Sequence, residues 1–76
     1  MTKGEYRVGI DFNPSGDDMV GKIKLAAADL IDLIGDVEDS VPSSHDEVNR
    51  LKALAQTAIE EGAMWGVKAA TKRAPT

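Results

Sequence analysis

The sequence predicts an all-α fold in which two helices form an antiparallel hairpin, preceded by an extended N-terminal arm. Two segments repeat apolar residues in steps of three and four, which is the spacing of one helix face. An acidic connector that contains Pro42 separates the two segments. Because 76 residues are too few to bury both apolar faces within one chain, we expect the hairpin to assemble into a homo-oligomer.

Residues 1–15 are predicted to form the arm and the turn that ends it. Apolar or aromatic side chains occupy every second position at Tyr6, Val8, Ile10 and Phe12. A period of two is typical of an extended segment, which must pack on the helices or pair with the arm of another protomer. Pro14 fixes its own φ angle and disfavours helix at Asn13, so the arm is expected to end at this turn.

The first long helix is expected over residues 16–35. Ser15 or Asp17 can serve as its N-cap, and Gly35 is a suitable end. Its apolar stripe consists of Val20, Ile23, Ala27, Leu30 and Ile34. The acidic segment 36–43 then forms the connector.

The second long helix is expected over residues 44–71, followed by a basic tail at 72–76. Ser44 and Glu47 have the spacing of a capping box, which marks a helix start. The apolar stripe of this helix consists of Val48, Leu51, Ala55, Ala58, Gly62, Trp65 and Ala69. We expect this stripe to pack against the first helix and against other protomers.

Small residues four positions apart form a ridge along the second helix. The ridge consists of Ala58, Gly62, Gly66 and Ala70, with Met64, Trp65 and Val67 beside it. A glycine inside a helix costs roughly 1 kcal/mol relative to alanine, so two on one ridge favour a surface where another helix packs closely. We expect the packing partner to be a second copy of the chain.

The composition argues against several classes of function. A formal net charge of −4 is unsuited to coating DNA or an anionic membrane, because both need a dense basic surface. The absence of cysteine excludes disulfides and thiolate zinc sites. No apolar run is long enough to span a bilayer, and the first residues lack the apolar core of a signal peptide. We therefore expect a soluble protein.

No motif for catalysis or metal binding stands out. His45 is the only histidine, and no serine or cysteine is spaced to form a catalytic unit with it. Three connector residues and one residue of the second helix match positions of a calcium loop: Asp36, Glu38 and Ser40, with Glu47. Val41, however, stands where that loop needs a glycine. We expect no catalytic residue, no metal site and no cofactor.

Three side chains are candidates for binding an anionic ligand. Phe12 precedes a turn near a helix N-terminus, where its ring can either stack on a nucleobase or plug the end of the hairpin. Lys24 flanks the apolar stripe, from which its ammonium group can reach a phosphate or remain solvated. Arg50 can grip a phosphate or pair with nearby acids. The residue pattern alone leaves each pair of alternatives open.

Two motifs together resemble a known family. They are FNPSG-x-x-x-V-x-x-IK-x-x-x-A-x-LID at Phe12 to Asp32 and AMW-x-VKAATK at Ala63 to Lys72. The chain resembles the phage-encoded hairpin-domain anti-defence proteins, which are nucleotide sponges that counter CBASS and Thoeris immunity. The resemblance implies sequestration of cyclic oligonucleotide second messengers without catalysis, in the host cell cytoplasm, so that CBASS effectors stay inactive.

The resemblance also implies an assembly and a set of ligand-binding residues. It implies a homohexamer with cyclic dinucleotides in pockets between protomers, and cyclic trinucleotides at separate sites in some members. By position, Phe12 corresponds to the stacking aromatic, Asn13 and Ser15 to polar contacts, and Lys24 to the phosphate contact. Arg50 is the candidate for a trinucleotide site. Gly66 departs from the alanine expected between Trp65 and Val67.

The sequence is also compatible with other functions. An oligomeric helical adaptor can inhibit a host protein by direct contact, using leucine and valine side chains exposed on the hairpin. An assembly chaperone or a structural phage component is a further alternative. Nucleotide that co-purifies with the protein and is released by heat favours the sponge, whereas protein free of nucleotide favours the adaptor.

Overall fold

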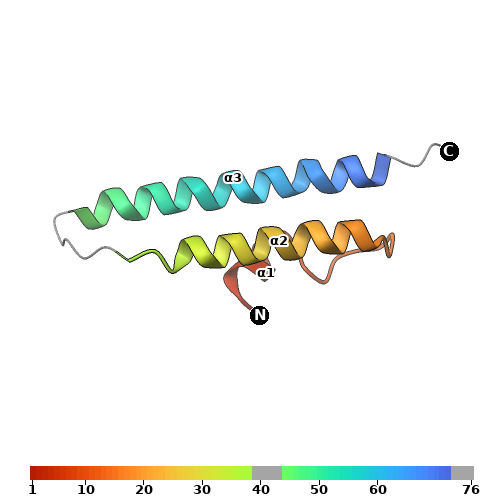
Figure 1. Cartoon of the computed structure of the whole chain (residues 1–76), viewed down its shortest axis with the longest axis horizontal. Helices are drawn as coiled ribbons and strands as arrows, with labels where there is room; N and C mark the ends of the chain where they lie inside the picture. The colour runs from red at the N-terminus through yellow and green to blue at the C-terminus, as the bar shows by residue number, and fades with distance from the viewer. Residues whose placement is uncertain (39–43, 73–76) are drawn as a thin grey trace.

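A computed structural model of the protein describes residues 1–38 and 44–72. These residues form three helices and no strand: α1 at Lys3–Val8, α2 at Asp18–Gly35 and α3 at His45–Lys72. Helices α2 and α3 run antiparallel side by side, and the short α1 lies against α2 (Figure 1). The prediction of an all-α helical hairpin is therefore confirmed. None of these helices is long and apolar enough to cross a membrane.

Helix α1 replaces the extended arm, so the prediction of an extended conformation for this segment was wrong. The Thr2 hydroxyl accepts a hydrogen bond from the Glu5 amide at 3.0 Å, and the Glu5 carboxylate accepts one from the Thr2 amide at 2.7 Å. This capping box starts the helix, and Gly9 ends it with a left-handed φ of 65°. Local capping thus outweighs the period of two in the apolar side chains.

Gly4 allows α1 to lie directly on the backbone of α2. A Cβ atom at Gly4 would stand 2.1 Å from the carbonyl oxygen of Ala28, so only glycine fits at this contact. The Gly4 amide donates a hydrogen bond to the Asp32 carboxylate at 2.7 Å. These two contacts fix the start of α1 to α2.

Polar side chains also tie α1 to α3. Lys3 Nζ donates to Gln56 Oε1 at 3.0 Å, and Gln56 Nε2 donates to the Ile31 carbonyl at 3.0 Å. Gln56 is only 2% exposed, so its amide joins all three helices in the interior. Arg7 Nε lies 2.8 Å from Glu60 Oε1 in an ion pair that links the end of α1 to α3.

The buried face of α2 differs in part from the predicted stripe. Asp17 caps this helix, since its carboxylate accepts a hydrogen bond from the Met19 amide at 2.8 Å. The buried residues are Val20, Lys24, Ala27, Ala28 and Ile31. Leu30, which was predicted to be buried, is 44% exposed. The difference arises because α2 packs against α1 as well as α3, so its buried surface covers more than one stripe.

The predicted stripe of α3 faces α2 only in part, because Val48 and Ala55 are half-buried beside Ile34 of α2 while the other five stripe residues are exposed. The buried residues of α3 are Gln56, Ala63 and Ala70. Leu51 and Trp65, both assigned to the packed stripe, are 51% and 62% exposed. The polar Gln56 lies on the buried face, which hydrophobic spacing alone does not identify. The exposed part of the predicted stripe forms an outward face of this protomer, and its packing against other protomers stays a prediction.

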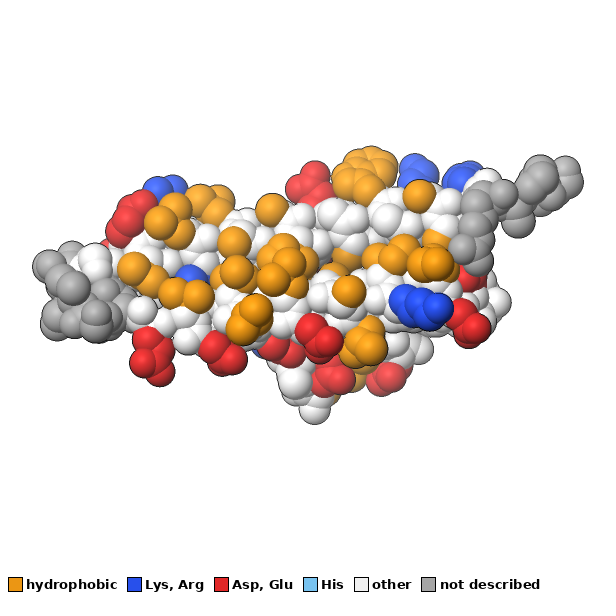
Figure 2. Space-filling view, in the orientation of Figure 1, with side chains coloured by type: hydrophobic (Ala, Val, Ile, Leu, Met, Phe, Trp, Pro, Cys, Tyr) orange, Lys and Arg blue, Asp and Glu red, His pale blue; other side chains and the backbone are white. Residues whose placement is uncertain are grey.

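The small-residue ridge is divided between the two faces of α3. A Cβ atom at Gly66 would lie 3.3 Å from Ile23 Cγ2, so Gly66 allows α2 and α3 to approach closely. Gly62 has no atom within 4 Å of such a Cβ atom and lies exposed. Hydrophobic side chains follow the line where α2 and α3 meet, and acidic side chains gather along the opposite edge of α2 (Figure 2).

Candidate functional site

The loop between α1 and α2 presents Phe12 to solvent. The Phe12 amide donates a hydrogen bond to the Gly9 carbonyl at 2.9 Å, and the Gly16 amide donates to the Asn13 carbonyl at 3.0 Å. These bonds form two successive turns, the second of which uses the left-handed φ of 64° at Gly16. The Phe12 side chain is 71% exposed, so it does not plug the end of the hairpin within this protomer.

Asn13 and Ser15 hold the second turn together. Ser15 Oγ donates to Asn13 Oδ1 at 3.0 Å, and Asn13 Nδ2 donates to the Asp17 carbonyl at 3.0 Å. The Asp17 amide in turn donates to Ser15 Oγ at 3.3 Å. Both predicted polar residues therefore lie beside Phe12 and are fixed to the first residues of α2.

Lys24 lies beneath this loop and is only 8% exposed. The sequence suggested a flanking lysine with a solvated or phosphate-bound head group, but the side chain is buried. Its Nζ donates to the Gly9 carbonyl at 2.9 Å and also to the Phe12 carbonyl. The same ammonium lies 5.4 Å from the centroid of the Phe12 ring, within the range of a cation–π interaction. The fold thus brings Phe12, Asn13, Ser15 and Lys24 together, and we call these four residues the Phe12 cluster.

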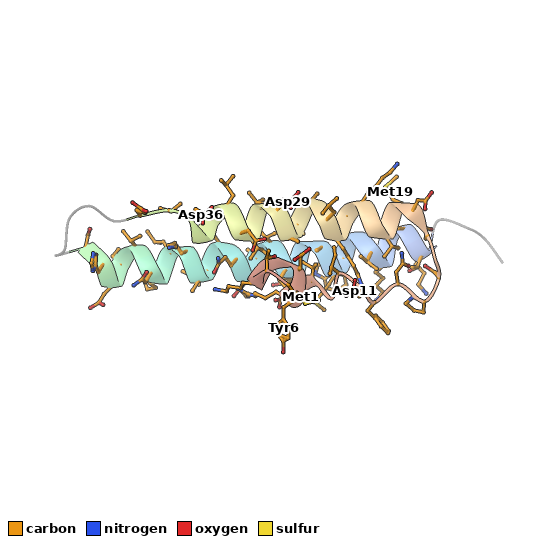
Figure 3. The ribbon with its side chains drawn as sticks, turned by 90° about the horizontal axis from the view of Figure 1, so that it is seen from below. Met1, Tyr6, Asp11, Met19, Asp29 and Asp36 are labelled. Atoms are coloured by element: carbon orange, nitrogen blue, oxygen red, sulfur yellow. The ribbon has the colours of Figure 1, made fainter. Side chains whose placement is uncertain are left out.

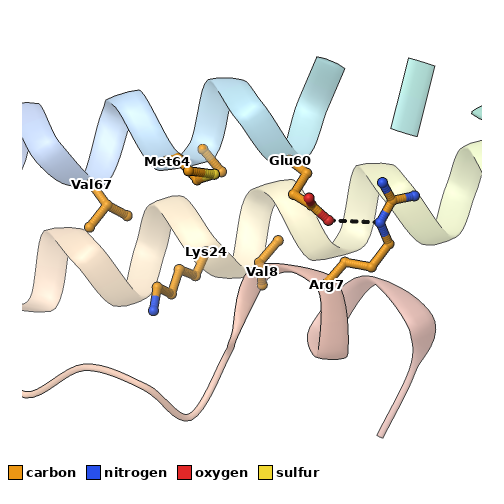
Figure 4. Close-up of a pocket in the computed structure, with 7 residues that line it drawn as sticks. Arg7, Val8, Lys24, Glu60, Met64 and Val67 are labelled. Carbon is orange, nitrogen blue, oxygen red and sulfur yellow. Dashed lines mark hydrogen bonds and ion pairs between the residues drawn. The ribbon is translucent and has the colours of Figure 1, made fainter. Parts of the chain in front are cut away.

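A small cavity of about 200 Å³ opens beside Lys24 (Figure 4). Its lining residues come from all three helices: Arg7, Val8, Lys24, Glu60, Ala63, Met64 and Val67. Most of its walls are apolar, including the stem of Lys24, while the ion pair between Arg7 and Glu60 supplies its polar boundary.

Arg7 and Val8 were not predicted to line this cavity, because both were assigned to an extended arm. The capping box formed by Thr2 and Glu5 was a signal that could have identified α1. Tyr6, by contrast, is 75% exposed and points away from the helices (Figure 3). Residues that were expected to share one face of a strand therefore point in different directions.

Arg50 lies in a separate place, near the start of α3. Its guanidinium contacts the Glu47 carboxylate at 2.5 Å through Nη2 and at 3.2 Å through Nε. The hydrogen bonds that Arg50 donates to the Glu47 carboxylate raise the pKa of Arg50, and desolvation opposes this shift. The antiparallel hairpin places the start of α3 at the opposite end of the molecule from the Phe12 loop (Figure 1). Arg50 therefore does not belong to the Phe12 cluster within one protomer.

A shallow hollow of about 430 Å³ adjoins Arg50. Its other lining residues are Ala53, Leu54, Thr57, Ala58 and Glu61. These residues belong to the outward face of α3. Farther along this helix, Trp65 is 62% exposed and carries the Lys68 ammonium 5.4 Å from its ring centroid.

Comparison with protein families identifies the chain. The profile described as Acb2/Tad1, hairpin domain, matches residues 4–71, which include α2 and all but one residue of each of α1 and α3. The chain belongs to the Acb2/Tad1 hairpin domain family. Comparisons with curated proteins and with solved structures produced no match.

Membership in the Acb2/Tad1 hairpin family assigns the broad role of the protein. Members are phage sponge proteins that act against CBASS and Thoeris defence, and the family consists of binding proteins rather than enzymes. The matched region contains the Phe12 loop, Lys24 and Arg50. Within residues 1–38 and 44–72, no group of three or more histidine or acidic side chains is placed to hold a metal ion. Ser40 and Val41 of the calcium-loop pattern lie outside these residues.

Proposed function

We propose that this protein binds cyclic dinucleotides and sequesters them uncleaved in the host cell cytoplasm, so that CBASS effectors remain inactive. Membership in the sponge family supports the class of ligand. The exposure of the Phe12 ring is the observation that locates the proposed binding site on the molecule. The ring is 71% exposed beside a buried ammonium group, an arrangement that suits a base next to a phosphate.

Each residue of the Phe12 cluster has a role in this proposal. The exposed ring of Phe12 stacks on a nucleobase, an interaction worth roughly 1–3 kcal/mol. Lys24 holds a positive charge below the ring and favours the phosphates. Asn13 and Ser15 supply amide and hydroxyl groups at the edge of the site, since both belong to the turn that follows Phe12.

We further propose that the outward face of α3 packs against other protomers in a homohexamer. Apolar and small side chains follow this face at Leu51, Leu54, Ala58, Gly62, Trp65 and Ala69. Its three large side chains are each more than half exposed, and the open space at Gly62 leaves room for a helix of another copy. In the proposed hexamer, the Phe12 loops of different protomers meet at shared pockets. Such pockets enclose a ligand more fully than the exposed Phe12 ring and the small cavity of one protomer do.

Arg50 is proposed to serve a second site, which takes cyclic trinucleotides. It lies far along the hairpin from Phe12 and beside its own hollow, so the two ligand classes do not compete for one place. Glu47 forms an ion pair with the Arg50 guanidinium. A ligand phosphate must therefore share the guanidinium with Glu47 or displace the Glu47 carboxylate. Both side chains of this pair are more than half exposed, so the guanidinium is accessible to a ligand.

Calorimetry with both ligand classes tests the two-site proposal. Phe12→Ala is expected to weaken binding of a cyclic dinucleotide by roughly tenfold to a hundredfold while sparing a cyclic trinucleotide. Arg50→Ala is expected to do the reverse. Equal losses for both ligands in both variants would contradict the two-site arrangement. Absence of binding by the wild-type oligomer would refute the sponge proposal and favour an adaptor that contacts a host protein.

A further inference from the structure

We propose that Lys24 is a positioning residue, which holds the Phe12 ring in its exposed orientation before any ligand arrives. The inference rests on the proposed function, because it assumes that Phe12 is the stacking ring. It differs from a direct phosphate contact, since the contacts of Lys24 in this structure are with the protein itself. Two backbone carbonyls and one face of an aromatic ring surround its ammonium group.

The contacts of Lys24 are of the kind that fix a backbone. Its Nζ donates to the carbonyls of Gly9 and Phe12, which lie 15 and 12 residues earlier in the chain. The Gly9 carbonyl also accepts the amide of Phe12 at 2.9 Å, so the ammonium closes both ends of this turn. Two of the three N–H donors of Lys24 are thereby engaged in holding the loop.

Apart from the hydrogen bond between the Phe12 amide and the Gly9 carbonyl, the neighbouring contacts hold the loop on either side of Phe12. On the α1 side, the amide of Gly9 donates to the carbonyls of Glu5 and Tyr6 at the helix end. On the α2 side, Asn13 Nδ2 donates to the carbonyl of Asp17. Between these anchors, Lys24 is the side chain that reaches the backbone of Phe12 itself.

The position of the ammonium also determines which face of the ring is available. It lies 5.4 Å from the ring centroid, while the side chain as a whole is 71% exposed. A ring with a cation on one face presents its other face to solvent, where a base can stack. Preorganisation of this kind reduces the entropy that a ligand must remove when it binds. Lys24 therefore contributes to affinity through Phe12, in addition to any attraction between its charge and a phosphate.

The first test follows the ring in the absence of ligand. The chain contains a single phenylalanine, so biosynthetic labelling with 4-fluorophenylalanine gives one fluorine NMR signal that reports Phe12 alone. Lys24→Met keeps an apolar stem of similar length but removes the ammonium. We expect its fluorine signal to move toward that of the unfolded protein. Lys22→Met is the matched control, because Lys22 is exposed on the same helix, and its signal should match wild type.

An unchanged fluorine signal in folded Lys24→Met would overturn the inference. Should this variant fail to fold, a measurement on the wild-type protein decides the same question. Nuclear Overhauser effects are expected between the Phe12 ring protons and the terminal methylene protons of Lys24. Their absence from the folded wild-type protein would also overturn the inference.

A double-mutant cycle then tests whether Lys24 acts through the ring. The probe is 3′,3′-cyclic GMP–AMP, and the variants are Phe12→Ala, Lys24→Met and the double variant. We expect Lys24→Met to weaken binding by at least several-fold more in the wild-type background than in the Phe12→Ala background. Equal fold losses in both backgrounds would show that Lys24 acts independently of the ring. If wild-type protein does not bind the probe, the proposed function fails, while the fluorine and Overhauser measurements still decide the positioning role.

Discussion

Replacement of Gly4 by alanine is expected to destabilise the protein, although alanine normally stabilises a helix. The added Cβ atom would lie 2.1 Å from the carbonyl oxygen of Ala28, whereas ordinary contact begins at 3.4 Å. Because backbone atoms cannot rotate away as a side chain can, α1 must withdraw from α2 by about 1 Å or more. The hydrogen bond of 2.7 Å from the Gly4 amide to Asp32 would then stretch beyond a useful length.

The expected size of the effect follows from these contacts. Loss of a hydrogen bond to a charged acceptor costs about 1.5–3 kcal/mol. Withdrawal of α1 also strains the contact of Lys3 with Gln56 and that of Arg7 with Glu60. The higher helix propensity of alanine returns at most about 1 kcal/mol. We expect a net loss of about 2 kcal/mol, which corresponds to a fall of about 10 °C in the melting temperature of a domain this small.

Chemical denaturation followed by circular dichroism measures this change. The protein concentration must be the same for all variants, because association contributes to the stability of an oligomer. Gly21→Ala is the matched control, since no atom lies within 4 Å of the added Cβ atom and the residue lies inside α2. This control should be as stable as wild type or more stable by up to about 1 kcal/mol. If Gly4→Ala shows the same gain as Gly21→Ala, the close packing of α1 on α2 is refuted.

Three further predictions concern assembly and the two binding regions. Gly62→Leu should dissociate the oligomer by overfilling the outward face of α3; light scattering that shows an unchanged mass would exclude this face from the interface. Glu47→Gln should release Arg50 and tighten binding of a cyclic trinucleotide several-fold at low salt, and weaker binding in calorimetry would contradict a competitive role for Glu47. Phe12→Ala should change the unfolding free energy by less than about 0.5 kcal/mol, because the ring is 71% exposed. A large fall in its melting temperature would instead favour a structural plug.

The two long helices were predictable because their signals are local and agree with one another. Capping at Asp17, helical spacing and the glycine at position 35 all indicate the helix that became α2. The faces were harder to predict, since a buried polar residue does not contribute to a hydrophobic pattern. Gln56 satisfies both ends of its amide through Lys3 and Ile31, which makes its burial favourable only in the folded arrangement.

The Phe12 loop was predictable in composition, while the environment of Lys24 was not. Proline and glycine around Asn13 and Ser15 indicate a turn, and the turn is present. The burial of Lys24 depends on carbonyl groups from residues 9 and 12, which no spacing in the sequence reveals. Arg7 lines the neighbouring cavity because α1 is helical. The period of two in the apolar side chains predicted an extended segment instead of this helix.

We propose that the protein holds a cyclic dinucleotide and returns it unchanged. To test this, the wild-type protein is incubated with 3′,3′-cyclic GMP–AMP, free nucleotide is removed, the protein is denatured by heat, and the released nucleotide is identified by chromatography and mass spectrometry. We expect the intact cyclic dinucleotide, in a fixed ratio to protein that does not change with incubation time. A linear product would contradict sequestration without cleavage, and a complete lack of retained nucleotide would contradict the sponge function itself.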